Sequence, residues 1–104
     1  ERIAQESKLP LDLGNVTVIG HSAGGALALW VSAKAKEVVP RLAVAVAPVS
    51  DLFEGYRAKL SDEGDAVQNY MKCTPETPEG AEAYARACPT RLLPVTVTTL
   101  LVHG

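Results

Sequence analysis

The sequence has no excess of charge of one sign, no long hydrophobic run and few cysteines. Its 104 residues include ten basic and twelve acidic side chains, which give a formal net charge of −2. These charges are spread along the chain and form no basic stripe, which argues against nucleic acid or an anionic membrane as a partner. The longest apolar run, Ala23 to Val31, is far short of the roughly 18 residues that indicate a membrane-spanning helix. We therefore expect a soluble protein and favour the cytoplasm as its location.

Residues that could bind a metal are also scarce. The two cysteines, Cys73 and Cys88, and the two histidines lie far apart in the sequence and have no short paired spacing, so no metal site is predicted. A disulfide between the cysteines would close a loop of about 15 residues and contribute about 3 kcal/mol. We favour unpaired thiols in a reducing compartment, because nothing else in the sequence indicates secretion, and the pairing stays open.

The N-terminus has neither an initiator methionine nor the apolar core of a secretory signal. We expect from this that the 104 residues belong to a longer chain, and that the N-terminal and C-terminal parts of their domain lie outside them. The composition, with 47% hydrophobic and 21% charged residues, is that of an ordinary globular domain and excludes a disordered or fibrous chain.

The apolar pattern predicts strands that alternate with helices. The predicted strands are Val16–Gly20, Leu42–Ala47 and Val95–Val102. The predicted helices are 1–8, 23–35, 51–60, 65–72 and 77–87. The second strand is apolar throughout, which is typical of a parallel sheet covered on both faces. This order indicates an α/β fold with a partial doubly wound parallel sheet and right-handed crossovers.

Residues 53–93 form a helical excursion between the second and third predicted strands. Thr77 and Pro78 are expected to open its last helix as N-cap and first helical residue. Ligands of a doubly wound sheet bind outside the carboxyl ends of its strands, and the excursion begins at that edge. It is therefore a candidate cap over a site, although helices at this place can equally be simple packing elements.

The most informative stretch is 16–25, in which β-branched residues lead into a glycine-bracketed serine and then into an apolar helix. The pattern Gly20-x-Ser22-x-Gly24 between a strand and a helix is typical of a nucleophile elbow, which places a serine hydroxyl at the top of a parallel sheet. We expect Gly20 and Gly24 to permit the tight turn, because a β-carbon two residues from the serine has little room. Gly25 should let the start of the helix lie close to its neighbours.

Other glycine-rich motifs fit this stretch less well. As a dinucleotide-binding fingerprint, Gly20-x-Ser22-x-x-Gly25 has a side chain in place of the second glycine, and no acidic residue ends the next strand. A phosphate-binding P-loop requires a lysine after the glycines, and none follows. A serine that merely capped the helix would not need a glycine on both sides, so the sequence favours a nucleophile that needs no cofactor.

Residues 16–25 resemble the nucleophile region of the α/β-hydrolase superfamily, and most of all its esterase and kynurenine-formamidase-like branch. Residues 46–52 are similar to the strand that follows the nucleophile helix in that family. Residues 88–94, leading into 100–104, are similar to the approach to the strand that precedes the catalytic acid. The resemblance spans nearly the whole chain, so residues 1–104 are expected to be part of one α/β-hydrolase domain.

The resemblance implies a serine hydrolase that acts on carboxylic esters or aryl formamides, with a small-molecule ester or amide as its partner. Ser22 would be the nucleophile that forms an acyl-enzyme, and the amide of Ala23 would be one donor of the oxyanion hole. The family's acid and base would lie beyond Gly104 and its second oxyanion donor before Glu1. Because serine needs a base near neutral pH, the 104 residues alone should be almost inert.

Two alternatives remain open. A peptidase of the prolyl-oligopeptidase type shares the strand, elbow and helix arrangement. A non-catalytic binding module of the α/β-hydrolase fold, or an inactive truncated product, could also keep the elbow. The sequence does not indicate the oligomeric state.

Further polar and aromatic residues are expected to have structural roles. His21 adjoins the elbow serine, so its side chain should point elsewhere, and His103 should lie two strands away, about 9–10 Å by strand spacing. Asp51 is expected to be a helix N-cap rather than a catalytic acid. Trp30 and Tyr70 are expected to be packing residues rather than substrate platforms.

Overall fold

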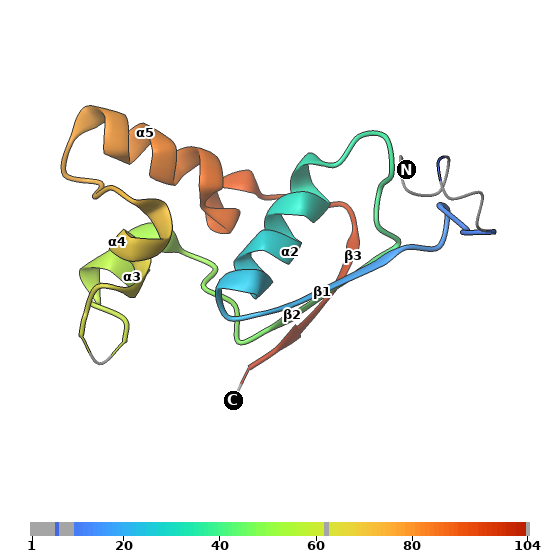
Figure 1. Cartoon of the computed structure of the whole chain (residues 1–104), viewed down its shortest axis with the longest axis horizontal. Coiled ribbons are helices and arrows are strands. Elements are labelled where there is room, and N and C mark those ends of the chain that lie inside the picture. Colours follow the sequence, from blue (N-terminus) through green and yellow to red (C-terminus); the bar gives the residue numbers. More distant parts are fainter. Residues whose placement is uncertain (1–5, 7–9, 62, 104) are drawn as a thin grey trace.

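A computed structural model describes residues 6, 10–61 and 63–103. Its strands, β1 (Thr17–His21), β2 (Leu42–Val46) and β3 (Thr98–Val102), form a parallel sheet in the order β1-β2-β3 (Figure 1). Helix α2 (Ala23–Lys34) connects β1 to β2. The predicted α/β fold with a partial parallel sheet is therefore confirmed. The helix predicted at 1–8 lies outside the described residues, apart from Glu6.

Helix α2 covers one face of the sheet, and small residues let it approach closely. Alternate side chains of a strand point to opposite faces, and Ala43 and Ala45 of β2 are fully buried on the face that α2 covers. The buried residues of α2 are also mostly small: Gly25, Ala26, Ala28, Leu29 and Ser32. The buried Ser32 hydroxyl donates to the carbonyl of Ala28 at 2.8 Å, so this buried donor has a hydrogen-bond partner.

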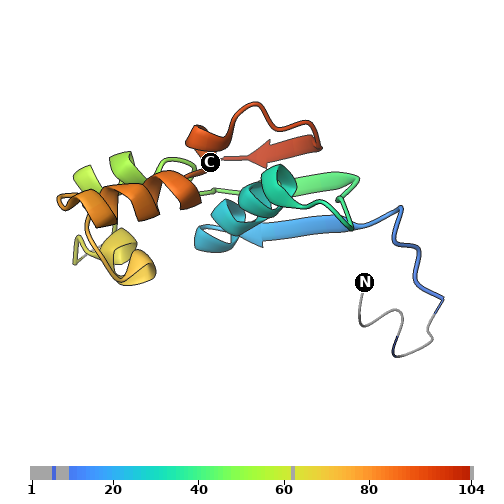
Figure 2. The same cartoon turned by 90° about the horizontal axis from the view of Figure 1, so that it is seen from above.

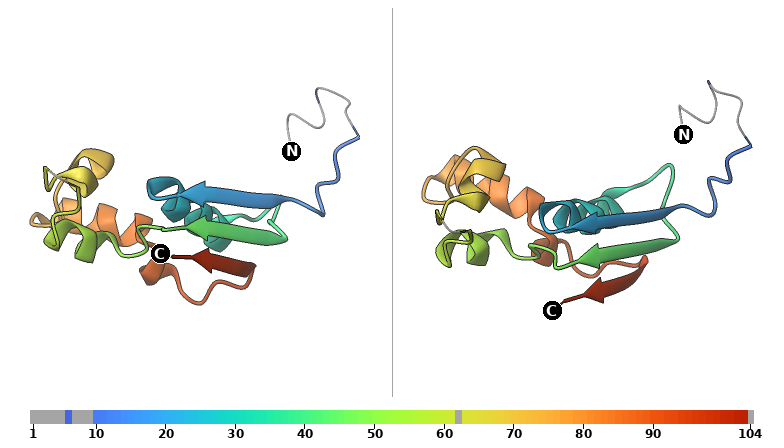
Figure 3. Two further views of the ribbon diagram at one scale, coloured as in Figure 1. Left: turned by 90° about the horizontal axis from the view of Figure 1, so that it is seen from below. Right: turned by 60° about the horizontal axis from the view of Figure 1, so that its bottom comes forward.

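The opposite face of the sheet carries no helix from the described part of the chain, as Figure 3 shows from below. Ile19, Val44 and Leu100 lie side by side on this face by strand register. Ile19 is 68% exposed and Leu100 is 52% exposed. The apolar sequence of β2 predicted that both faces of the sheet are covered. In the described ranges, 10–61 and 63–103, helices cover only the face against α2.

Helices α3 (Leu52–Arg57), α4 (Ala66–Met71) and α5 (Pro78–Ala87) form a lobe beyond the carboxyl ends of the strands (Figures 1 and 2). The short 3₁₀ helix η1 (Pro89–Leu92) then returns the chain toward β3. The lobe thus lies beyond the ends of the strands rather than over a face of the sheet.

Local capping explains where two of the lobe helices begin. The carboxylate of Asp51 accepts a hydrogen bond from the amide of Glu54 at 3.0 Å, and α3 starts at the next residue. The hydroxyl of Thr77 accepts from the amide of Gly80 at 3.0 Å, with Pro78 in the first turn of α5. Both N-caps were predicted from the sequence, because capping depends on residues within one turn.

The lobe has a hydrophobic core of its own, built around Tyr84. This residue is fully buried, with its ring centroid 5.6 Å from that of Phe53 and 6.2 Å from that of Tyr56. Its hydroxyl donates to the carbonyl of Cys73 at 2.8 Å. Burial raises the pKa of the phenol, so it remains a neutral donor. Tyr84 therefore fixes α5 against α3 and the segment before α5.

Both cysteines are free thiols, and Cys88 connects two parts of the lobe. Its fully buried sulfur accepts a hydrogen bond from the amide of Leu52 at 3.2 Å. Close by, the amide of Thr90 donates to the carbonyl of Ser50 at 3.0 Å. The segment after β2 is therefore attached to the segment that follows α5.

We predict that Tyr84→Ala destabilises the lobe by about 3–5 kcal/mol, since it removes a buried aromatic side chain. Tyr84→Phe should cost about 1 kcal/mol through loss of the hydrogen bond to Cys73. Urea unfolding of both variants measures the two effects. Tyr70→Phe, at a position 40% exposed, is the control and should change stability by less than about 0.5 kcal/mol.

We predict that the 104-residue chain self-associates through the exposed apolar face of the sheet opposite α2. Replacing Ile19 and Leu100 together with threonine keeps strand propensity but reduces apolar area, so the mean mass in sedimentation velocity should fall. Leu11→Thr, which changes an exposed leucine outside the sheet, should have no such effect. A chain that is monomeric at every concentration would contradict this prediction.

Candidate active site

Ser22 forms the turn between β1 and α2 in a strained backbone conformation. Its φ of 56° and ψ of −116° lie outside the regions that L-residues favour, at a cost on the order of 1–3 kcal/mol. Its amide donates to the carbonyl of Val46 at 2.9 Å. Its carbonyl accepts from the amides of Ala26 at 3.2 Å and Val49 at 3.3 Å. Backbone groups on three sides therefore maintain this conformation.

The Ser22 side chain is exposed, and its hydroxyl does not cap α2. It also makes no hydrogen bond to another residue within 10–61 or 63–103. A capping bond would give this serine a structural role at the start of the helix. Without that bond, the hydroxyl is available to a ligand.

Two glycines make the turn sterically possible. A β-carbon at Gly20 would overlap the carbonyl group of Gly24, so position 20 requires glycine. A β-carbon at Gly25 would lie 2.9 Å from the Cβ of Pro48, because the first turn of α2 rests directly on the loop after β2.

Gly24 does not have the role that the motif predicted for it. A β-carbon there would meet nothing within 4 Å among the described residues. The expectation that the tight turn requires Gly24 is therefore wrong for this part of the chain. The position faces open space, and it is its backbone carbonyl that excludes a side chain at Gly20.

Ser22 and Ala23 line a cavity of about 480 Å³ between the elbow and the lobe, a volume typical of small-molecule sites. The lining residues from the elbow and the strand ends are Ser22, Ala23, Ala26, Ala47, Pro48, Val49 and His103. Those from the lobe are Leu52, Leu60, Ser61, Ala66, Val67 and Tyr70. Most of these side chains are apolar, and the larger aliphatic ones among them, Leu52 and Leu60, come from the lobe.

The amide of Ala23 lies at the start of α2 and has no helical acceptor. It donates to no carbonyl or side chain within the described ranges. An amide at a helix N-terminus favours negative charge nearby. This amide can therefore stabilise an oxygen that becomes negative on a ligand bonded to Ser22.

The histidines lie on different sides of the sheet end. His21 is exposed and shares the uncovered face with Val46 and Val102, so its side chain points away from α2, as predicted. His103 follows β3, two strands from the elbow, also as predicted. It nevertheless borders the same cavity as Ser22, and no hydrogen bond holds it to another described residue.

Trp30 and Tyr70, both expected to be packing residues, have different positions in the structure. Trp30 donates from Nε1 to the carbonyl of Arg86 at 3.0 Å and so connects α2 to α5. Tyr70 lines the cavity that contains Ser22. The sequence pattern of α4 did not indicate this position, because it depends on how the lobe is placed relative to the sheet.

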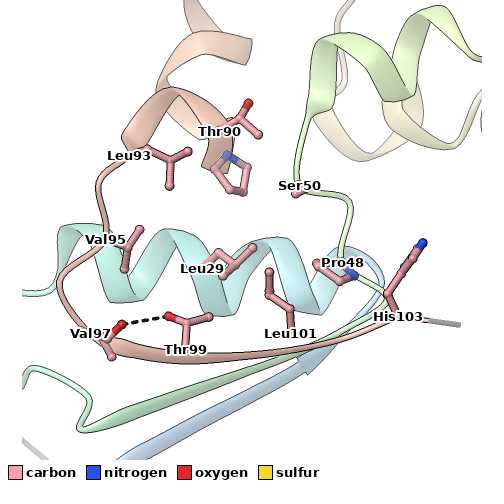
Figure 4. A pocket seen from close by; sticks show the side chains of 11 residues that line it. Leu29, Pro48, Ser50, Thr90, Leu93, Val95, Val97, Thr99, Leu101 and His103 are labelled. Carbon is pink, nitrogen blue, oxygen red and sulfur yellow. Dashed lines mark hydrogen bonds between the residues drawn. The ribbon is translucent and has the colours of Figure 1, made fainter.

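A second cavity, of about 630 Å³, lies between α2, β3 and η1 (Figure 4). Leu29 of α2 and Leu101 of β3 both line it. The hydroxyl of Thr99 donates to the carbonyl of Val97 at 2.9 Å and is not offered to a ligand. This cavity is larger, but it does not include Ser22, so the reactive group belongs to the smaller one.

Within the described ranges, no three His, Cys, Asp or Glu residues are grouped so that they could hold a metal ion. None of the helices in this part of the chain is long and apolar enough to cross a membrane.

Residues 2–96 match a family model described as alpha/beta hydrolase fold. The chain belongs to the α/β-hydrolase-fold family. The match spans most of the chain and agrees with the resemblance seen around Ser22. It also assigns this α/β-hydrolase-fold protein to a family of hydrolase-type enzymes. No curated protein matches the sequence.

Alanine substitutions should separate the three elbow glycines of this α/β-hydrolase-fold protein. Gly20→Ala and Gly25→Ala should each lower the free energy of unfolding by about 1–3 kcal/mol or more, since the added carbon meets backbone or Pro48. Gly24→Ala should raise it by up to about 1 kcal/mol, since alanine favours helix and the space is open. Urea unfolding of the three variants measures this order. A destabilising Gly24→Ala would contradict it.

Proposed function

We propose that the chain carries the nucleophile of a serine hydrolase of the carboxylesterase or arylformamidase type. The observation that supports this most is the strained, exposed Ser22 at the start of α2, facing a cavity. In this proposal Ser22 Oγ attacks the carbonyl carbon of an ester or aryl formamide and loses its proton to a base. The oxyanion lies at the Ala23 amide. The alcohol or amine then leaves with a proton, and water hydrolyses the acyl-enzyme.

In this mechanism the triad acid, the triad base and the second oxyanion donor come from residues outside 1–104. His103 borders the cavity, but two strand spacings of about 9–10 Å separate its strand from β1, which is beyond hydrogen-bond reach. Asp51 is already used as the N-cap of α3. Tests of activity therefore use the natural gene product that contains these 104 residues.

Ser22→Ala should abolish covalent labelling by a fluorophosphonate probe and lower kcat by about 10⁴–10⁶-fold. Ser61→Ala is the matched control, because it removes the other serine hydroxyl of the same cavity and should leave labelling unchanged. In-gel fluorescence and mass spectrometry of the labelled peptide give the readout. Equal labelling of wild type and Ser22→Ala would overturn the proposal.

Three substrates distinguish the proposal from its alternatives. Wild type should hydrolyse p-nitrophenyl acetate or a nitroformanilide faster than a prolyl dipeptide anilide. Preference for the dipeptide anilide would instead indicate a peptidase of the prolyl-oligopeptidase type. No labelling and no hydrolysis of any substrate would indicate a binding module that keeps the fold without the reaction.

A further inference from the structure

The buried thiol of Cys88 lies among polar atoms, although a buried cysteine usually behaves as a small hydrophobic side chain. Its sulfur accepts a hydrogen bond from the amide of Leu52 at 3.2 Å. The sulfur also lies 3.2 Å from Oγ1 of Thr90, 3.8 Å from Oδ1 of Asp51 and 3.9 Å from the carbonyl oxygen of Ser50. The thiol is therefore the centre of a polar cluster that joins residues 50–52 to residues 88–90.

The half of this cluster that follows α5 is fixed to the core of the lobe. The amide of Cys88 donates to the carbonyl of Tyr84 at 2.8 Å, and the amide of Arg91 donates to the carbonyl of Cys88 at 3.0 Å. The guanidinium carbon of Arg91 lies 4.5 Å from the centroid of the Phe53 ring. The thiol can therefore hold the segment before α3 in place from a rigid support.

The segment before α3 also reaches the nucleophile turn. The amide of Val49 donates to the carbonyl of Ser22 at 3.3 Å, and Val49 directly precedes Ser50 of the cluster. The backbone of Ser22 is strained, and a strained conformation persists only where its surroundings over-determine it. The hydrogen bond from Val49 is one of these restraints. Whatever holds residues 50–52 in place therefore also acts on Ser22.

We propose that Cys88 is a positioning residue for Ser22, which acts through residues 49–52 and touches neither the nucleophile nor the substrate. This inference rests on the proposed function of Ser22. Cys88 is fully buried and does not line the cavity that contains Ser22. Its role requires an acceptor for the Leu52 amide, which a serine hydroxyl also supplies and an alanine methyl does not. Loss of the acceptor leaves a buried amide without a partner and releases the segment that carries Val49.

Two substitutions at position 88 provide the kinetic test, in the natural gene product with p-nitrophenyl acetate. Cys88→Ala should lower kcat about tenfold and leave KM within about twofold, because a misplaced serine still binds the ester but reacts more slowly. The rate of fluorophosphonate labelling of Ser22 should fall by the same factor. Cys88→Ser restores the acceptor and should keep kcat within about threefold of wild type. A wild-type kcat in Cys88→Ala, or an equal loss in Cys88→Ser, would overturn the inference.

Cys73→Ala is the matched control, because it removes the other thiol of the lobe. Cys73 packs against the same hydrophobic core, and the hydrogen bond from Tyr84 goes to its carbonyl, which alanine keeps. Its kcat should stay within about twofold of wild type. Urea unfolding curves establish that every variant is folded at the assay temperature. If Cys73→Ala lowered kcat as much as Cys88→Ala, the rate would follow the stability of the lobe, and the inference would fail.

Hydrogen exchange separates the coupling between Cys88 and Ser22 from the chemistry. The amides of residues 20–26 and 47–52 should exchange at least about fivefold faster in Cys88→Ala than in wild type. In Cys88→Ser and Cys73→Ala they should match wild type. Unchanged exchange at residues 20–26 in Cys88→Ala would overturn the inference even if kcat fell. If fluorophosphonate does not label Ser22 in wild type, the proposed function fails, and the exchange result still decides whether Cys88 positions the turn at Ser22.

Discussion

The close contact between the end of β1 and the first turn of α2 is the constraint on which the candidate site depends. Gly20 lies against the carbonyl of Gly24, and Gly25 lies against Pro48, so neither position has room for a side chain. This contact brings the chain from strand to helix within one residue. Ser22 takes the positive φ as a result, and its side chain points to solvent rather than into the helix. The nucleophile candidate is therefore exposed because Gly20 and Gly25, which carry no side chain, allow this close contact.

The lobe is coupled to this turn through the backbone that follows β2. The amide of Val49 donates to the carbonyl of Ser22 at 3.3 Å, three residues before α3 begins at Leu52. The same segment is held from the other side, because Ser50 accepts from Thr90 and the amide of Leu52 donates to Cys88. The core of the lobe therefore contributes to the position of Ser22 without contact between their side chains.

Features that depend on neighbours in sequence could be predicted from the sequence, and features that depend on placement in space could not. The order of the strands, α2, the turn at Ser22 and the N-caps at Asp51 and Thr77 each follow from periodicity or from residues within one turn. The third strand is shorter than predicted, because it begins at Thr98 rather than Val95. The open space beside Gly24 and the position of Tyr70 in the cavity depend on how the lobe and elbow are oriented. The uncovered face could not be predicted either, because an apolar strand does not specify which segment covers it.

The elbow and the lobe contribute different walls to the cavity that contains Ser22. Reactivity in the proposed mechanism requires the Ser22 hydroxyl and the Ala23 amide, which the packing of α2 on β1 and β2 positions. The lobe side of the cavity is held in place by the core around Tyr84 and Val67. The two parts meet through the short loop after β2, whose amide at Val49 donates to the carbonyl of Ser22, so the packing of the lobe also bears on the backbone of the nucleophile candidate.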